Sequence, residues 1–245
     1  MVLAAGLGTR LRPLTNDRPK ALVQVANRTL LEITLRRLAG FGVRDVIVNV
    51  HHFADMIVEY LKANENFGMH VEISRETDLL DTGGGLKKAA WFFAADSEPF
   101  ILHNVDVIST IDCLEMLRFH ADTHALATLA VQDRQTSRYL IFDERLQLCG
   151  RRLVREQKLE SVRPAVQTQE FAFAGIHVIS PRFLSMMTEQ ASFSIISSYL
   201  HLAGQGEPIL GFRADGYYWR DLGTPENLKQ ASAEFEALST NKRGE

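Results

Sequence analysis

Glycines and basic residues gather in the first twenty positions of the chain. Gly6 and Gly8 follow a short apolar run, and Arg10 and Lys20 stand close behind them. Glycines at the end of a buried strand let backbone N–H groups approach a phosphate closely, and nearby cations add attraction. A dinucleotide-binding fingerprint would need a third glycine where Leu11 stands, and a P-loop would need Gly-Lys-Ser/Thr. The spacing therefore predicts a phosphate site that is neither of these two motifs.

A carboxylate suited to a metal ion follows an apolar strand in the middle of the chain. Asp106 ends the segment His103-Asn104-Val105-Asp106, which comes directly after the apolar residues 100–102. A carboxylate at the end of a buried strand is a natural Mg²⁺ ligand in a nucleotide site. His103 suits packing better than magnesium binding, because magnesium prefers oxygen ligands.

A glycine triplet at 83–85 precedes a predicted helix that runs toward Phe93. Such glycines allow a flat base or a ribose to approach the backbone, and a helix N-terminus attracts an anion. The same triplet also fits an ordinary loop. Both interpretations stay open from the residues alone.

Strands and helices alternate through the first half of the chain, which indicates a parallel sheet covered by helices on both faces. The predicted strands there are 1–5, 46–50, 71–74 and 100–102, and the predicted helices are 29–39, 54–62 and 112–120. The second half is more mixed, with predicted strands at 125–131, 139–142, 171–179 and 209–212 and helices at 183–187, 195–202 and 226–238. Thr224 and Pro225 are typical of a helix start. We predict one doubly wound α/β domain over residues 1–238 and a flexible tail at 239–245.

The composition is ordinary for a globular protein. The 245 residues are 46% hydrophobic and 23% charged, and the formal net charge is −3. This charge gives no electrostatic reason to expect nucleic acid or an anionic membrane as a partner. Cys113 and Cys149 form neither a metal-ligand pair nor a disulfide framework, and no apolar stretch is long enough to span a bilayer. These features predict a cytoplasmic protein that binds neither nucleic acid nor membranes.

Four segments, taken in order, resemble the signature of the sugar nucleotide pyrophosphorylases. They are L-A-A-G-x-G-T-R-L-R-P with P-K-A-L at 3–13 and 19–22, L-D-T-G-G-G at 80–85, H-N-V-D-V at 103–107 and Y-W-R-D-L-G-T-P-E at 218–226. The resemblance is strongest to the short forms that act on mannose 1-phosphate or N-acetylmuramate 1-phosphate. It implies a Rossmann-like fold of the nucleotide-diphospho-sugar transferase type, with a mixed, mainly parallel sheet. It also implies transfer of a nucleotidyl group from an NTP to a sugar 1-phosphate, two small-molecule substrates.

The resemblance also implies roles for individual residues. Lys20 would neutralise charge at the α-phosphate with Arg10 beside it, and Asp106 and Asp221 would hold Mg²⁺. The expected catalytic residues are Arg10, Lys20 and Asp106, and the expected metal ligands are Asp106 and Asp221. The residues expected to bind the nucleotide are Ala4, Ala5, Gly6, Gly8, Thr9, Arg10, Lys20, Asp81, Thr82, Gly83 and Gly84.

The sugar side of the site is less well defined. The Glu-Lys-Pro segment that the family usually carries is absent, and Val105 stands where the family usually has a glycine. The candidates for sugar contacts are Asn104, Gly150, Glu170 and Phe173. For Gly150 and Phe173 a structural role is the stronger alternative. His51 and His52 are predicted to lie in a surface loop, because no third metal ligand stands nearby.

Other functions remain open at this point. A non-catalytic nucleotide-sugar-binding or regulatory protein would share the fold, although Asp106, Asp221 and Lys20 together argue against it. A nucleotide-sugar-dependent glycosyltransferase would need an Asp-x-Asp motif, and residues 104–106 offer one carboxylate. A choline-phosphate cytidylyltransferase would need an aromatic cage for its cation, which the residues do not clearly show. The base, the sugar, and the choice between monomer and homodimer also stay open.

Overall fold

The chain forms two compact units. The computed structural model describes residues 1–94 and 97–241, with the backbone alone for 235–241. Unit 1 combines Met1–Leu79, Asn104–Thr110 and the C-terminal segment from Trp219 onward, and unit 2 combines Leu80–His103 and Ile111–Tyr218. Each unit is therefore built from separate stretches of the chain.

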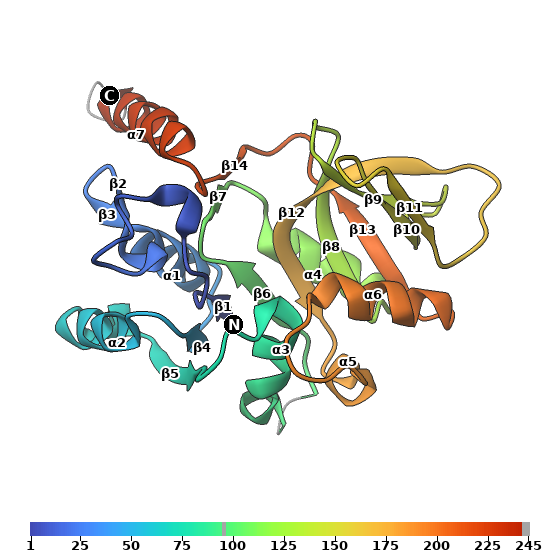
Figure 1. The fold of residues 1–245 in the computed structure, drawn as a ribbon, viewed down its shortest axis with the longest axis horizontal. Helices are drawn as coiled ribbons and strands as arrows, with labels where there is room; N and C mark the ends of the chain where they lie inside the picture. The colour runs from blue at the N-terminus through green and yellow to red at the C-terminus, as the bar shows by residue number, and fades with distance from the viewer. Residues whose placement is uncertain (95–96, 242–245) are drawn as a thin grey trace. The chain divides into compact units, whose positions relative to one another are not determined.

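Unit 1 has a parallel sheet in which β4 lies between β1 and β5 (Figure 1). Its strands are β1 (Val2–Leu3), β2 (Gln24–Val25), β3 (Arg28–Thr29), β4 (Asp45–Val50), β5 (His70–Arg75), β7 (Val107–Ser109) and β14 (Trp219–Asp221). Its helices are α1 (Leu30–Gly40), α2 (Ala54–Ala63) and α7 (Pro225–Asn241), with short 3-10 turns at Thr9–Leu11, Lys20–Leu22 and Glu65–Gly68. The apolar residues of β4 are all fully buried, as expected for a strand with neighbours on both sides.

Two of the predicted helix starts in unit 1, those of α1 and α7, are confirmed by side-chain caps. The Thr29 hydroxyl accepts a hydrogen bond of 3.1 Å from the Glu32 backbone N–H at the start of α1. The Thr224 hydroxyl accepts one of 3.3 Å from Asn227 N–H, with Pro225 as the first residue of α7. Each hydroxyl satisfies an N–H group that the helix cannot satisfy itself. Because α7 extends to Asn241, residues 239–241 of the predicted tail are helical, and 242–245 lie outside the described residues.

Unit 2 is organised around a long strand, β12, which pairs antiparallel with β6, β8 and β9. Its strands are β6 (Phe100–Asn104), whose last residue belongs to unit 1, β8 (Ala127–Gln132), β9 (Arg138–Phe142), β10 (Leu148–Leu153), β11 (Lys158–Ser161), β12 (Gln169–Ile179) and β13 (Ile209–Arg213). Its helices are α3 (Asp81–Lys88), α4 (Cys113–Asp122), α5 (Arg182–Met186) and α6 (Ile195–Gly204). Strand β13 pairs with β8 in parallel, and β10 joins β9 and β11 in antiparallel ladders.

The prediction of an α/β fold with a mixed sheet is confirmed. The parallel pairs lie in the first half of the chain and at β8–β13, while most of the later pairs are antiparallel. In unit 2, α4 contacts β8 and β12, whereas α6 contacts β10 and β13 and packs against α3. Within the described part of the chain, no helix combines the length and the apolar character needed to cross a membrane.

A buried histidine in unit 2 is expected to make the stability of the protein depend on pH. His177 forms a 2.7 Å hydrogen bond with the Tyr199 hydroxyl, and burial, aided by nearby His103, lowers the pKa of His177 from 6.5 to about 3. Below pH 6.5 the His177 imidazole therefore binds a proton in the unfolded chain but stays neutral in the folded protein. The free energy of unfolding is expected to fall as the pH drops from 6.5 toward 3, by about 1.4 kcal/mol for each pKa unit crossed.

Urea unfolding between pH 7 and pH 4 measures this effect. The His177→Gln variant keeps a hydrogen-bonding side chain without a titrating ring, so its stability should depend less steeply on pH. The control is His201→Gln, which changes an exposed histidine and should leave the slope as in the wild type. Equal slopes for His177→Gln and the wild type would contradict the expectation.

Candidate active site

The glycine-rich loop follows β1 and is anchored by side chains near both of its ends. Ala4 N–H donates to the Asn49 side-chain oxygen at 2.7 Å, and the Thr15 hydroxyl donates to the Gly8 carbonyl at 2.9 Å. Gly8 has φ +63°, and a Cβ there would stand 3.0 Å from side-chain atoms of Lys20 and Thr15. Glycine is therefore required at this position both by its backbone angle and by the close neighbours.

The outer part of the same loop is open. Gly6 is exposed, and a Cβ built on it would meet nothing within 4 Å. Thr9 and Arg10 are also exposed, whereas Ala4 and Ala5 are buried beneath them. The loop therefore presents backbone groups from Gly6 onward to solvent, as an anion-binding loop at the end of a strand does.

Lys20 and Asp106 form an ion pair at this end of β1. Lys20 begins a 3-10 turn and is only 9% exposed, and its ammonium group contacts Asp106 Oδ2. Asp106 is held by the backbone around it: Val105 N–H donates to the Leu3 carbonyl at 3.1 Å, and Leu222 N–H donates to the Asp106 carbonyl at 2.8 Å. Two residues that are far apart in sequence are thus fixed as a charge pair beside the loop.

Asp221 belongs to the strand that pairs with the residues after Asp106. In the β7–β14 ladder, Asp221 stands opposite Val107. Its Oδ1 accepts a 2.7 Å hydrogen bond from Gly223 N–H and lies 3.9 Å from the Arg10 guanidinium. A Cβ at Gly223 would stand 2.3 Å from that guanidinium, so glycine leaves room for Arg10. All four residues expected to carry charge chemistry therefore lie in unit 1.

These two carboxylates are suited to Mg²⁺. Both are oxygen ligands, and the ladder brings the chain position next to Asp106 opposite Asp221. Magnesium is commonly held by one or two carboxylates together with phosphate oxygens of the substrate. The described residues contain no cluster of three or more His, Cys, Asp and Glu side chains placed to hold a metal.

In unit 2, the glycine triplet packs against the segment that leads into α6. Gly83 and Gly84 N–H groups donate to the Phe193 carbonyl at 2.9 and 3.3 Å. A Cβ on Gly83 would stand 2.3 Å from the Phe193 ring, and one on Gly84 would stand 2.6 Å from the Ala191 carbonyl. The Thr82 hydroxyl accepts a 3.0 Å bond from Ile195 N–H. The triplet lies within α3 and not in a loop, and close packing within the protein explains why Gly83 and Gly84 are glycines.

The sugar-side candidates of unit 2 lie on neighbouring strands. Gly150 in β10 and Glu170 in β12 both stand opposite Ile141 of β9. A Cβ on Gly150 would stand 2.2 Å from the Glu160 carbonyl, so the close approach of β11 explains this glycine. Glu170 binds the Arg152 guanidinium, and these hydrogen bonds raise the pKa of Arg152.

The remaining two candidates have different surroundings. The Phe173 ring stands edge-on to the His177 ring at 4.6 Å between centroids, and its carbonyl accepts a 2.8 Å hydrogen bond from Arg134. This packing agrees with the structural alternative for Phe173. Asn104 ends β6, two positions before Asp106, and is half-buried.

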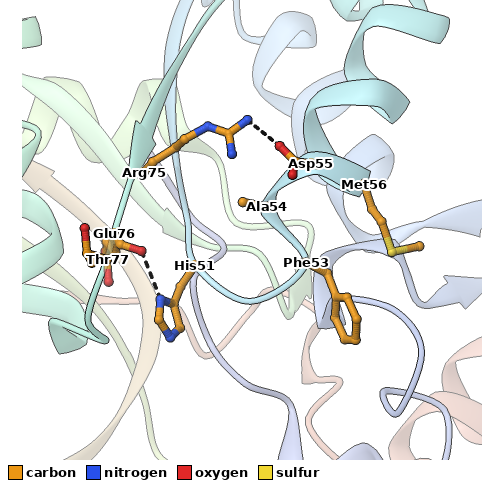
Figure 2. A pocket seen from close by; sticks show the side chains of 8 residues that line it. All are labelled: His51, Phe53, Ala54, Asp55, Met56, Arg75, Glu76 and Thr77. Atoms are coloured by element: carbon orange, nitrogen blue, oxygen red, sulfur yellow. Dashed lines mark hydrogen bonds and ion pairs between the residues drawn. The ribbon is translucent and has the colours of Figure 1, made fainter.

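A cavity of about 550 Å³ lies at the carboxyl ends of β4 and β5. Figure 2 shows His51 hydrogen-bonded to the Glu76 carbonyl and Arg75 paired with Asp55. Phe53 also lines the cavity. The other lining residues are Ala54, Met56 and Thr77. His51, predicted in a surface loop, is half-buried and lines this cavity.

Sequence reasoning missed two buried polar residues beside this cavity. Asn49 Nδ2 donates to Glu76 Oε1 at 2.7 Å, and Glu76 is 5% exposed. A sequence signal existed for Asn49, because it is a polar residue inside the otherwise apolar run Val46-Ile47-Val48-Asn49-Val50. Buried polar side chains are almost always hydrogen-bonded, so an Asn in a buried strand indicates partners nearby.

Comparison with known proteins identifies the family of the chain. A family described as "Nucleotidyl transferase" matches residues 1–237. The N-acetylmuramate alpha-1-phosphate uridylyltransferase of Caulobacter vibrioides is 34% identical over 242 residues, which cover 95% of each protein. The mannose-1-phosphate guanyltransferase of Yarrowia lipolytica is 28% identical over 247 residues, covering 100% of this chain. The chain spans 66% of the length of that fungal protein.

Among solved structures, HddC from Yersinia pseudotuberculosis, complexed with GMP-PN, has the same fold. The two superpose with a TM-score of 0.75 at 22% sequence identity, and the match covers 96% of this chain and 97% of that one. At this level of identity the likeness concerns the fold, and it confirms the predicted type of α/β architecture.

Proposed function

The chain belongs to the nucleotidyl transferase family, and from this membership we propose that it transfers a nucleotidyl group from an NTP to a sugar 1-phosphate. The products are an NDP-sugar and pyrophosphate. The observation that carries the proposal is the set formed by Lys20, Asp106, Asp221 and Arg10 in unit 1, next to the open loop at Gly6. Cations and carboxylates beside a loop of free backbone groups suit a highly anionic pair of substrates.

The reaction is an in-line substitution at the α-phosphorus. An oxygen of the sugar phosphate forms a bond to this phosphorus while the bond to the β-phosphate oxygen breaks, and pyrophosphate leaves with that electron pair. The attacking phosphate is already ionised, so the step needs no protein nucleophile. Lys20 and Arg10 lower the repulsion between the two anions, and Lys20 is the more strongly oriented of the two because it is the more buried.

Asp106 and Asp221 are the residues that would hold Mg²⁺. When bound, the ion supplies positive charge at the phosphate oxygens. The proposed nucleotide contacts remain Ala4, Ala5, Gly6, Gly8, Thr9, Arg10 and Lys20 in unit 1 and Asp81, Thr82, Gly83 and Gly84 in unit 2. Asn104 and Glu170 remain the proposed sugar contacts, with Gly150 and Phe173 more plainly explained by packing.

We further propose that residues 1–238 act as one catalytic domain, in the cytoplasm and as a monomer or homodimer. The family match over residues 1–237 supports a single functional region. Cys113 and Cys149 are buried and do not form a disulfide with each other, which supports a reducing compartment.

Pyrophosphate release in the presence of Mg²⁺ tests the proposal. UTP, GTP, CTP, dTTP and ATP are each combined with sugar 1-phosphates, including those of mannose and N-acetylmuramate, and with choline phosphate. Release that requires one NTP and one sugar phosphate is the expected result and names both substrates. Release only with CTP and choline phosphate would redirect the assignment to a cytidylyltransferase. Folded protein that releases pyrophosphate with no pair would favour a nucleotide-sugar-binding protein without turnover.

A further inference from the structure

Asn49 connects the strand ends on either side of it. It lies in β4, is 2% exposed, and uses both ends of its side-chain amide. Its oxygen accepts from Ala4 N–H and its nitrogen donates to Glu76 Oε1, each at 2.7 Å. Ala4 directly follows β1 and Glu76 directly follows β5. The amide thus links the start of the glycine-rich loop to the residue that directly follows β5.

The contact between Asn49 and Glu76 is buried. Glu76 is 5% exposed, so its carboxylate, which accepts from Asn49 Nδ2, makes hydrogen bonds within the protein. The backbone of Glu76 is fixed as well, because its N–H donates to the Val50 carbonyl at 2.8 Å and its carbonyl bonds to His51. Asn49 therefore links Ala4 to the buried side chain of a residue whose backbone N–H and carbonyl are both hydrogen-bonded.

The adjacent buried polar residue does nothing comparable. Ser74 stands opposite Asn49 in the β4–β5 ladder and is 4% exposed. Its hydroxyl has no hydrogen-bond partner among the described residues. A buried polar side chain at this place in the sheet therefore does not by itself connect β1 to β5. Ser74 is a matched control for Asn49.

We propose that Asn49 is a positioning residue for nucleotide binding. By fixing the Ala4 amide it sets where the glycine-rich loop leaves the sheet, while Thr15 fixes the loop at Gly8. The loop between Ala4 and Gly8, which includes the exposed Gly6, is then held in one conformation in which its backbone groups can bind the phosphates. The inference rests on the proposed function, since it assigns Asn49 to the nucleotide end of that site.

Direct binding of NTPs, measured by calorimetry without turnover, tests the role. Asn49→Leu removes both hydrogen bonds at nearly constant volume and should weaken binding of the preferred NTP about tenfold. Ser74→Ala should bind as the wild type does. A purely structural Asn49 would lower the melting temperature of Asn49→Leu and leave the affinity of the folded protein unchanged, which would overturn the proposal.

A double-mutant cycle separates Asn49 from any role of Glu76 itself. Asn49→Asp places two carboxylates face to face, so it should weaken binding strongly. In the Glu76→Gln background the new carboxylate can accept hydrogen bonds both from Ala4 N–H and from the introduced side-chain amide, so the same change should cost far less. Equal losses in the two backgrounds would overturn the proposal. If the wild-type protein binds no NTP, the proposed function fails, whereas normal wild-type binding with unaffected Asn49 variants removes only the role of Asn49.

Discussion

Replacing Asp106 by Asn is expected to lower kcat by about 10³-fold, the upper end of the effect of removing one electrostatic contact in an active site. The change keeps the size of the side chain and removes the charge that Lys20 contacts. It also takes away one of the two carboxylates proposed to hold Mg²⁺. Steady-state pyrophosphate release with the preferred substrate pair measures the effect, and the melting temperature checks that the variant is folded.

Asp45→Asn is the matched control for Asp106→Asn. Asp45 belongs to the same unit and also pairs with a basic side chain, His70, but both side chains are exposed. Exposed pairs of this kind contribute little to stability, and turnover should remain at the wild-type level. The assignment of Asp106 would be wrong if its variant kept turnover within tenfold of the wild type, or if the control lost as much.

Replacing Gly83 by Ala is expected to lower the free energy of unfolding by about 1–3 kcal/mol, the usual range for overpacking a dense interior. The added methyl group would stand 2.3 Å from the Phe193 ring and 3.0 Å from Ile195 N, so the chain before α6 must move. This movement would also disturb the hydrogen bonds from Gly83 and Gly84 to the Phe193 carbonyl. Urea unfolding of the wild type and the variant measures the change.

Two further variants test whether packing against Phe193 causes the loss of stability in Gly83→Ala. Gly40→Ala makes the same substitution in α1, where nothing lies within 4 Å of the new methyl group. It should be neutral or stabilising by up to about 1 kcal/mol, because alanine favours a helix. Adding Phe193→Leu to Gly83→Ala should recover part of the loss, since the planar ring is the obstacle. Equal effects of the alanine at positions 40 and 83 would show that packing against Phe193 is not the reason.

Long elements with a clear hydrophobic pattern could be predicted from the sequence. The strand at 46–50 and the helix after Thr29 were found with ends within one or two residues of β4 and α1. The strands β7 and β14 were not predicted. Each has only three residues, which is too short for a periodic pattern, and their pairing is determined by segments more than a hundred residues apart. Propensity carries little information where tertiary contacts decide.

The residues of the candidate site differ in how far the sequence alone points to them. Asp106 could be recognised from its place after an apolar strand, but Asp221 came from the family resemblance alone. The ladder that brings Asp221 opposite Val107 explains why no spacing rule could have found it. The glycine triplet is conspicuous in the sequence, but the reason for Gly83 is not. The Phe193 ring that leaves no room for a side chain there comes from a distant part of the sequence.

The discontinuity of unit 1 has a consequence for how the protein is made. Asp106 leaves the ribosome long before Asp221, with roughly 115 residues between them, which take on the order of ten seconds to synthesise. Until the strand at Trp219–Asp221 emerges, β7 has no ladder partner and the Asp106 carbonyl lacks its bond from Leu222. A nascent chain therefore carries the glycine-rich loop and Lys20 without the complete charge set. The proposed set of charged residues is therefore complete only after Asp221 has been synthesised and β14 can pair with β7.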